Sequence, residues 1–313
     1  MANSNERGRA FEYCVRKKII EYAKSKGLAN SITSRTKARN IDEKVYFQAL
    51  DTSSAANFLS GAETFVTSQE FNNWLENASQ LELDRIPDNE AKQMDRTDIR
   101  LTITYADGKR KTKNLSVKNE HNALCHPRLA PLAQYCGIAK GSPTDLAYRA
   151  RYEKIWNNFY KKVEGLRKGI TSTTYLVENH PDFIAEHFWK PMQENAKEFL
   201  EKNANDPEHT AAYFTSLVGV TEYYVLKNKV KSIEIKHFPK IKSPASFKIT
   251  YPLDGKLDTF LIEFDNGWKI AQRLHTASSR LLKADGTVFM TEKEDPICIN
   301  LGELIKIEEL MKF

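Results

Sequence analysis

Two residues suited to the chemistry of phosphate esters stand at the ends of a short stretch of sequence. Asp98 opens a segment in which apolar and polar residues alternate, and Lys118 closes a second such segment after the turn signal Ala106-Asp-Gly-Lys. Because a hairpin places its strands side by side, we expect the aspartate and the lysine at one end of a sheet. There a carboxylate can hold Mg²⁺ against a phosphate, and a lysine can orient or activate the attacking water.

A second carboxylate is needed, because one carboxylate alone holds a divalent ion weakly. The position two before the lysine is Ser116, so the acid must come from elsewhere in the chain. The candidates are Glu12, in an expected N-terminal helix, and Glu120, which closely follows the lysine. Asp95 is a less favoured substitute for Asp98, because it precedes the strand. We therefore expect Asp98 and either Glu12 or Glu120 to bind the metal ion.

The surroundings of this pair resemble a known enzyme family. Asp98 with Ser116 and Lys118 resembles the PD-(D/E)xK nuclease motif, with serine where the family usually has an acid. The residues from Lys118 to Arg128 resemble the stretch that follows the catalytic lysine in restriction endonucleases of the HaeIII family. Two further short regions share the resemblance, residues 8–12 and residues 262–280.

The resemblance implies a type II restriction endonuclease that hydrolyses double-stranded DNA with Mg²⁺ as its cofactor. It implies the palindrome GGCC as the target, cut to blunt ends, and a cognate DNA methyltransferase as the functional partner that protects the host. Because a palindrome has matched half-sites, a homodimer on DNA is also expected. Ser116 counts among the catalytic residues through its place in the motif, beside Asp98, Lys118 and the glutamates.

Two polar segments are candidates for contact with DNA. Arginine can donate two hydrogen bonds to guanine, and serine can bind phosphates. The alternative is that these side chains face solvent or make local hydrogen bonds. The candidates are Asn119, His121, Asn122, His126 and Arg128 after the lysine, and Arg273, His275, Ser278, Ser279 and Arg280 near the C-terminus.

The same sequence bears on a zinc site, on ATP-driven cleavage and on two alternative functions with DNA. A zinc site at His121 and Cys125 is disfavoured, because the spacing of cysteines and histidines fits none of the familiar patterns. The sequence has no Gly-rich phosphate loop, which argues against ATP-driven cleavage. Two alternatives stay open: a repair or junction nuclease of the same fold without sequence choice, and a non-catalytic DNA-binding protein in which Ser116 marks lost activity.

The elements that must position these residues follow from hydrophobic periodicity and turn signals. We expect helices over residues 6–26, within 40–83 with Ser53 and Ser68 as caps, over 120–125, and through 145–215. We expect strands over residues 98–105, 112–118, 231–237, 247–251 and 259–264. The expected fold is α/β, restriction-endonuclease-like, with a mixed sheet flanked by helices and with helical and C-terminal β additions. We predict one domain over 1–313: a catalytic core to about 140, a helical insertion to about 225, and a C-terminal DNA-recognition part.

The composition is that of a soluble protein and is compatible with a polyanionic partner. The 313 residues are 41% hydrophobic and 28% charged, as in soluble globular proteins, and the net charge of +6 suits a polyanionic partner. The four cysteines form no CxxC pair, which is typical of reduced thiols in a cytoplasm. The N-terminus lacks an apolar signal core, and no apolar run is long enough for a bilayer. We expect a bacterial cytoplasmic protein with no membrane partner.

Overall fold

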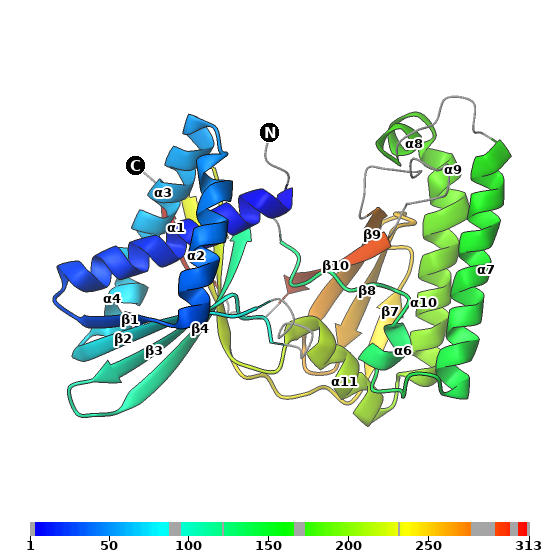
Figure 1. The fold of residues 1–313 in the computed structure, drawn as a ribbon. Helices are drawn as coiled ribbons and strands as arrows, with labels where there is room; N and C mark the ends of the chain where they lie inside the picture. Colours follow the sequence, from blue (N-terminus) through cyan, green and yellow to red (C-terminus); the bar gives the residue numbers. More distant parts are fainter. Residues whose placement is uncertain are drawn as a thin grey trace. The chain divides into compact units, whose positions relative to one another are not determined.

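The computed structural model describes residues 4–87, 95–120, 122–165, 173–230, 232–276, 292–300 and 306–311. The chain falls into two compact units (Figure 1). Unit 1 comprises Met1–His121, Gly219–Ile241 and Glu303–Phe313, and unit 2 comprises Asn122–Val218 and Lys242–Gly302. The division of the chain into a core, an insertion and a recognition part stays a prediction. None of the described helices combines the length and the apolar character that a membrane crossing requires.

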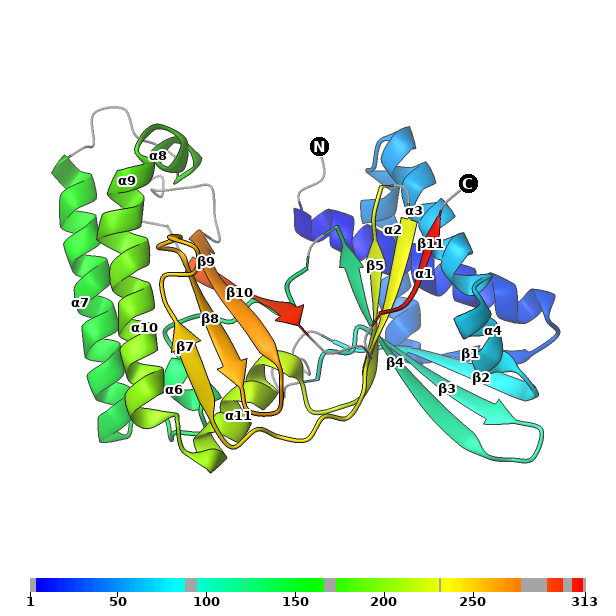
Figure 2. The same ribbon diagram turned by 180° about the vertical axis from the view of Figure 1, so that it is seen from behind.

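Unit 1 contains a mixed sheet with the strand order β1-β2-β3-β4-β5-β6-β11. β1 pairs with β2, and β4 with β5, in parallel, whereas the other neighbours are antiparallel. β5 and β11 come from later parts of the chain and complete the sheet beyond β4 (Figure 2). The strands are β1 (Ala29–Ile32), β2 (Ala78–Arg85), β3 (Ile99–Tyr105), β4 (Arg110–Asn119), β5 (Tyr223–Asn228), β6 (Ser232–Phe238) and β11 (Lys306–Met311).

The helices among the described residues of this unit are α1 (Ser4–Ser25), α2 (Ser34–Gln48), α3 (Thr52–Val66) and α4 (Gln69–Leu75). Apolar residues of the strands, such as Leu101 and Leu115, form one buried core with Phe11 of α1 and Phe58 of α3. Truncating Phe11 to alanine would cost about 3–5 kcal/mol through the cavity it leaves. The predicted α/β class, with a mixed sheet flanked by helices, is confirmed at this coarse level.

The alternation of side chains along β4 matters for the site. Leu115 and Val117 belong to the buried core that also contains residues of α1, and Ser116 and Lys118 alternate with them along the strand. Ser116 is buried and Lys118 is half-buried. The hairpin that joins β3 to β4 turns where the sequence predicts it, and Gly108 there has a φ of +81°, which glycine adopts without strain.

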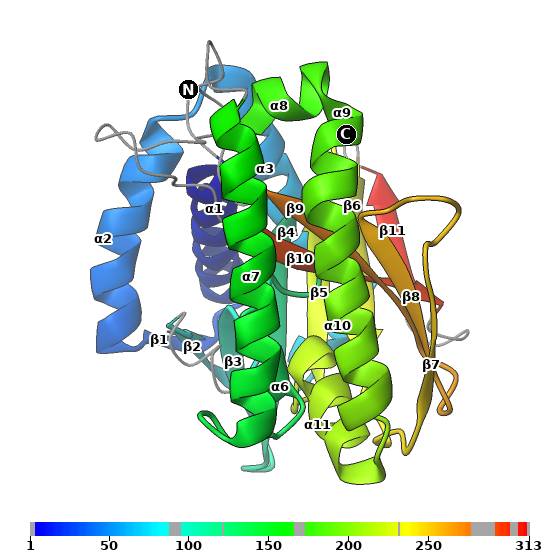
Figure 3. The same ribbon diagram turned by 90° about the vertical axis from the view of Figure 1, so that its right-hand side faces the viewer.

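Unit 2 packs helices and a separate antiparallel sheet with the strand order β10-β9-β8-β7. The long helices α7 and α10 run side by side (Figure 3). The strands are β7 (Phe247–Thr250), β8 (Thr259–Phe264), β9 (Lys269–Thr276) and β10 (Glu292–Asn300). The helices are α6 (Leu132–Tyr135), α7 (Pro143–Gly165), α8 (Thr173–Asn179), α9 (Pro181–Ile184), a π-helix η1 (Ala185–Trp189), α10 (Lys190–Asn203) and α11 (Pro207–Val218).

The helix caps test the local predictions directly. Ser68 caps α4 as predicted, because its Oγ accepts a hydrogen bond from the N–H of Phe71 at 3.1 Å. Ser53 does not cap α3. That role belongs to Asp51, whose carboxylate accepts from the N–H of Ser54 at 2.8 Å.

Two predicted helical segments are wrong. Residues 78–83 belong to β2, where Leu81 and Leu83 alternate with partly exposed residues and pair with β3. The predicted helix over 120–125 does not form either. Glu120 has a φ of +65° and its N–H bonds to the carbonyl of Asn228 at 2.9 Å, so the chain continues the β4–β5 pairing before it turns away. The described residues 122–125 have no helical structure.

Candidate functional site

The hairpin brings Asp98 to Ser116 and Lys118. Asp98 directly precedes β3, whose first residue, Ile99, pairs with Leu115. The N–H of Asp98 donates to the carbonyl of Leu115 at 2.8 Å. Its Oδ2 accepts from the N–H of Val117 at 2.7 Å and from Ser116 Oγ at 3.3 Å. The residues that the motif places together are therefore adjacent, while their catalytic roles stay a prediction.

Burial raises the pKa of Asp98 above its ordinary value, because the protein replaces the water that would stabilise the ionised carboxylate. The positive charge of Lys118 is the largest opposing influence, followed by the hydrogen bond from Val117 and the charge of Arg9. The other oxygen, Oδ1, accepts no hydrogen bond from the described residues. Asp98 thus has one oxygen fixed by the protein and one that is available to a ligand.

Glu12 supplies a second carboxylate to the same electrostatic environment. It lies on α1 and is only 7% exposed. Burial, the charge of Asp98 and the charge of Glu43 raise the pKa of Glu12 to about 8, although Arg9 and Arg16 oppose the shift. Because the charge of Asp98 acts on Glu12, the two carboxylates form an interacting pair of acids.

Glu120 lies apart from this pair. It is exposed at the end of β4, and its backbone N–H contacts Asn228 of β5. Glu12 is buried and experiences the charge of Asp98, whereas Glu120 is exposed at the end of β4, so Glu12 is the better candidate for the second acid. No group of three or more His, Cys, Asp or Glu side chains with the geometry of a metal site occurs among the described residues.

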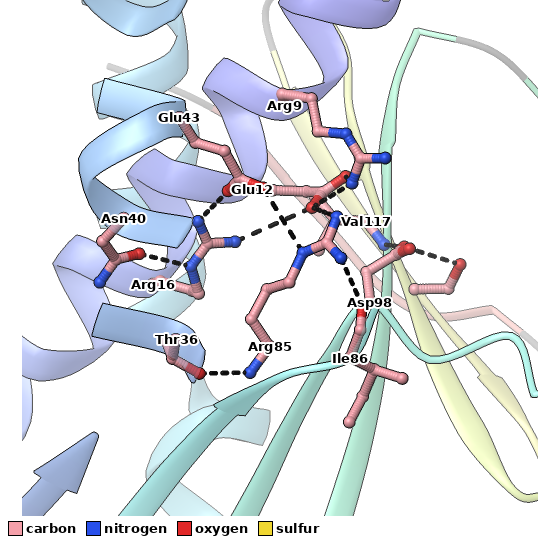
Figure 4. Close-up of polar contacts among 11 residues, drawn as sticks. Arg9, Glu12, Arg16, Thr36, Asn40, Glu43, Arg85, Ile86, Asp98 and Val117 are labelled. Carbon is pink, nitrogen blue, oxygen red and sulfur yellow. Dashed lines mark hydrogen bonds and ion pairs between the residues drawn. The ribbon is translucent and has the colours of Figure 1, made fainter. Parts of the chain in front are cut away.

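A buried set of charges surrounds Glu12, and the sequence analysis missed it. Figure 4 shows the guanidinium groups of Arg9, Arg16 and Arg85 around the Glu12 carboxylate, with Glu43 of α2 beside them. Arg16 is fully buried, and Arg85 and Glu43 are each 2% exposed. Buried charges are rare and must be paired, so this cluster links α1, α2 and β2 through ion pairs.

A second lysine stands next to Lys118. In the parallel register of β4 and β5, Lys118 lies directly opposite Lys227, so both side chains point to the same face. Lys227 is 9% exposed, and its other strand neighbour is Glu234 of β6. Like charges directly opposite each other are unfavourable by a few tenths of a kcal/mol to about 1 kcal/mol. An anion at this face would offset that repulsion.

Asp95 anchors the chain before the strand instead of joining the site. Its Oδ2 accepts from Arg100 Nη2 at 2.9 Å. Its Oδ1 accepts from the N–H of Thr97 at 3.0 Å and from Thr221 Oγ1 at 3.3 Å. Both oxygens are therefore used to hold the segment that leads into Asp98.

The candidate DNA contacts lie in different parts of the fold. Asn119, at the end of β4 in unit 1, accepts a hydrogen bond from Asn228 Nδ2 at 2.9 Å. The segment after it enters unit 2, where Asn122, His126 and Arg128 are exposed. On β9, also in unit 2, Arg273 is exposed and His275 is half-buried. His121, Ser278, Ser279 and Arg280 lie outside the described residues.

The cysteine of the disfavoured zinc interpretation has a different environment. The thiol of Cys125 is directed at the carbonyl of Leu217, with an S···O distance of 3.6 Å. With the predicted helix absent, the spacing of His121 and Cys125 no longer argues for a shared ligand.

Comparison of the chain with family models, curated proteins and solved structures gave no match. The resemblance to HaeIII-type restriction endonucleases therefore stays a prediction.

Proposed function

We propose that this protein is a Mg²⁺-dependent DNA endonuclease of the PD-(D/E)xK type, with Asp98 and Glu12 as the metal-binding acids and Lys118 as the catalytic cation. The observation that carries the proposal is the position of Asp98. Its carboxylate accepts hydrogen bonds from Val117 and Ser116 of β4, under the electrostatic influence of Lys118 and in interaction with the buried Glu12.

The two acids fit a divalent cation by their chemistry. Hard cations such as Mg²⁺ prefer carboxylate oxygens, and Asp98 Oδ1 has no hydrogen bond among the described residues. Burial raises the pKa values of both carboxyl groups, the charge of Asp98 raises that of Glu12 further, and a cation between them would favour their ionised forms. The bound ion would supply neutralisation of charge on the phosphate and acidification of water.

The chain's own residues have separate tasks in this proposal. Val117 and Ser116 hold one oxygen of Asp98, so the carboxylate keeps a fixed direction. Lys118, on the same face of β4 as Ser116, orients the water that attacks phosphorus and stabilises the negative charge that develops. The serine at the usual acid position thus supports the aspartate, and Glu12 from α1 replaces the missing acid.

The finer parts of the proposal follow the sequence resemblance. They are a restriction-endonuclease-like fold, type II cleavage of double-stranded DNA at GGCC, a homodimer on the palindrome and a cognate methyltransferase in the cytoplasm of a bacterium. The net charge of +6 supports a polyanionic substrate.

A digest of a plasmid of known sequence tests the activity and the specificity together. The full chain should cut the DNA in Mg²⁺ and not in EDTA, and Asp98→Ala and Lys118→Ala should each reduce the rate at least about 100-fold. Fragments that end elsewhere than GGCC would overturn the specificity alone. Cleavage by either folded variant at the wild-type rate would overturn the assignment of the site.

A further inference from the structure

The two innermost arginines of the buried cluster direct their hydrogen bonds away from Glu12. Arg16 Nε donates to Asn40 Oδ1 at 2.9 Å, and Arg16 Nη2 bonds to Glu43 Oε2. Arg85 Nη1 donates to the carbonyl of Ile86 at 2.8 Å, and Arg85 Nε lies 3.4 Å from Glu43 Oε1. Glu43 is therefore in contact with both guanidinium groups (Figure 4).

Glu12, in contrast, has only long contacts with its arginines. Its Oε2 lies 3.8 Å from Arg16 Nη1, 3.8 Å from Arg85 Nη2 and 3.4 Å from Arg9 Nη1. Charge-assisted hydrogen bonds between a guanidinium and a carboxylate usually measure about 2.7–2.9 Å. Arg9 thus donates long hydrogen bonds to both oxygens of Glu12, whereas Arg16 and Arg85 lie farther from this carboxylate, although it is 7% exposed.

We propose that Glu43 is a positioning residue that holds Arg16 and Arg85 back from Glu12, so that the Glu12 carboxylate remains able to bind a divalent cation. The proposal rests on the proposed function, because it concerns the same metal site. It adds α2, which contributes no residue to the motif, to the parts of the fold that control metal binding.

The physical reason is competition for one carboxylate. Two buried guanidinium groups need an anionic partner, since an unpaired buried charge is strongly unfavourable. With Glu43 present, that partner comes from α2. When the charge of Glu43 is removed, Glu12 is the nearest remaining acid for both groups, and a close ion pair with them would occupy the oxygens that the metal requires.

Calorimetric titration of the full chain with Mg²⁺, without DNA, measures this directly. Glu43→Gln, which keeps the size of the side chain and loses its charge, should weaken Mg²⁺ binding about 10–100-fold, as is usual for residues that support metal ligands. Arg35→Met is the matched control. It removes the ion pair that ties α2 to Asp84 of β2 and leaves the cluster around Glu12 untouched, so Mg²⁺ affinity should stay at the wild-type value.

The triple variant Arg16→Met/Arg85→Met/Glu43→Gln separates positioning from a purely structural role. Replacing a buried set of ion pairs by neutral groups is often neutral for stability, and the variant removes both competing cations together with Glu43. It should bind Mg²⁺ within a few-fold of the wild type, even if Glu43→Gln alone does not fold. Equal affinity of Glu43→Gln and the wild type, or weak binding by the triple variant, would overturn the inference. A wild-type chain that binds no Mg²⁺ at all would instead overturn the proposed function.

Discussion

Metal binding at the proposed site should depend strongly on pH, because a cation binds the ionised form of Glu12. Burial, Asp98 and Glu43 raise the pKa of this carboxyl group from its ordinary 4.5 to about 8, so the proton must leave before the ion binds. One proton released per ion makes the apparent Mg²⁺ affinity rise about tenfold for each pH unit below 8. Between pH 6 and pH 8 the expected gain is about 50-fold, because half of the Glu12 carboxyl groups are still protonated at pH 8, and the gain levels off above that range.

Calorimetry in two buffers of different ionisation enthalpy provides the assay. The dependence of the observed enthalpy on the buffer gives the number of protons released, which should be about one or more near pH 7. The pKa of Asp98 is also raised, which adds to the release. The matched variant Glu12→Gln should bind Mg²⁺ more weakly and release fewer protons. A Mg²⁺ affinity that is constant from pH 6 to pH 8, or the same proton release in wild type and variant, would refute the reasoning.

Three further predictions use other parts of the unit. Without divalent ions, the raised pKa of Glu12 means that the folded state binds its proton more tightly than the unfolded state. The free energy of unfolding, measured by urea titration, should therefore fall as pH rises from about 4.5 to about 8. A rise over this range would contradict the assigned shift. Lys227→Met should weaken duplex DNA binding in a filter-binding assay and reduce its salt dependence by about one counterion. Lys236→Met, on the neighbouring strand, should do neither. Equal effects of the two variants would argue against an anion site beside Lys118. Asp95→Ala should lower stability by about 1–3 kcal/mol in thermal unfolding, because Thr97, Arg100 and Thr221 lose their acceptor. An unchanged melting temperature would contradict this role.

The hairpin was predictable because its signals are local. Residues alternate over β3 and β4, and the Asp-Gly turn fits the positive φ of Gly108. These two features fix which residue lies opposite which, so the proximity of Asp98 to Ser116 followed from sequence alone. The strands β7 and β8 were found in the same way.

β5 and the arginine cluster were not predictable by such reasoning. Every residue of β5 is buried, so Lys227 and Asn228 interrupt no alternating pattern and give no strand signal. Arg16 and Arg85 have a residue type that is usually exposed, and their partners Asn40 and Glu43 are distant in sequence. Only the packing of α1 and α2 against the sheet brings these charges together.

Segment 78–83 shows how local patterns mislead. Its mixture of leucines and acidic residues suits a helix as well as a strand, and pairing with β1 and β3 decides in favour of the strand. The segment that begins at Glu120 was mispredicted as a helix for a similar reason. Helix-forming residues follow Glu120, but the backbone bond to Asn228 extends the strand geometry instead.

The central claim, that Asp98 and Lys118 form one Mg²⁺-dependent hydrolytic site, is tested most directly by single-turnover cleavage of duplex DNA with two matched aspartate variants. Asp107 lies in the turn of the same hairpin, where it pairs with Lys109 and is exposed, so Asp107→Asn should cut at the wild-type rate in Mg²⁺. Asp98→Asn, which has the same size but no charge, should cut at least about 100-fold more slowly while still folded. Equal rates for the two variants would contradict the claim.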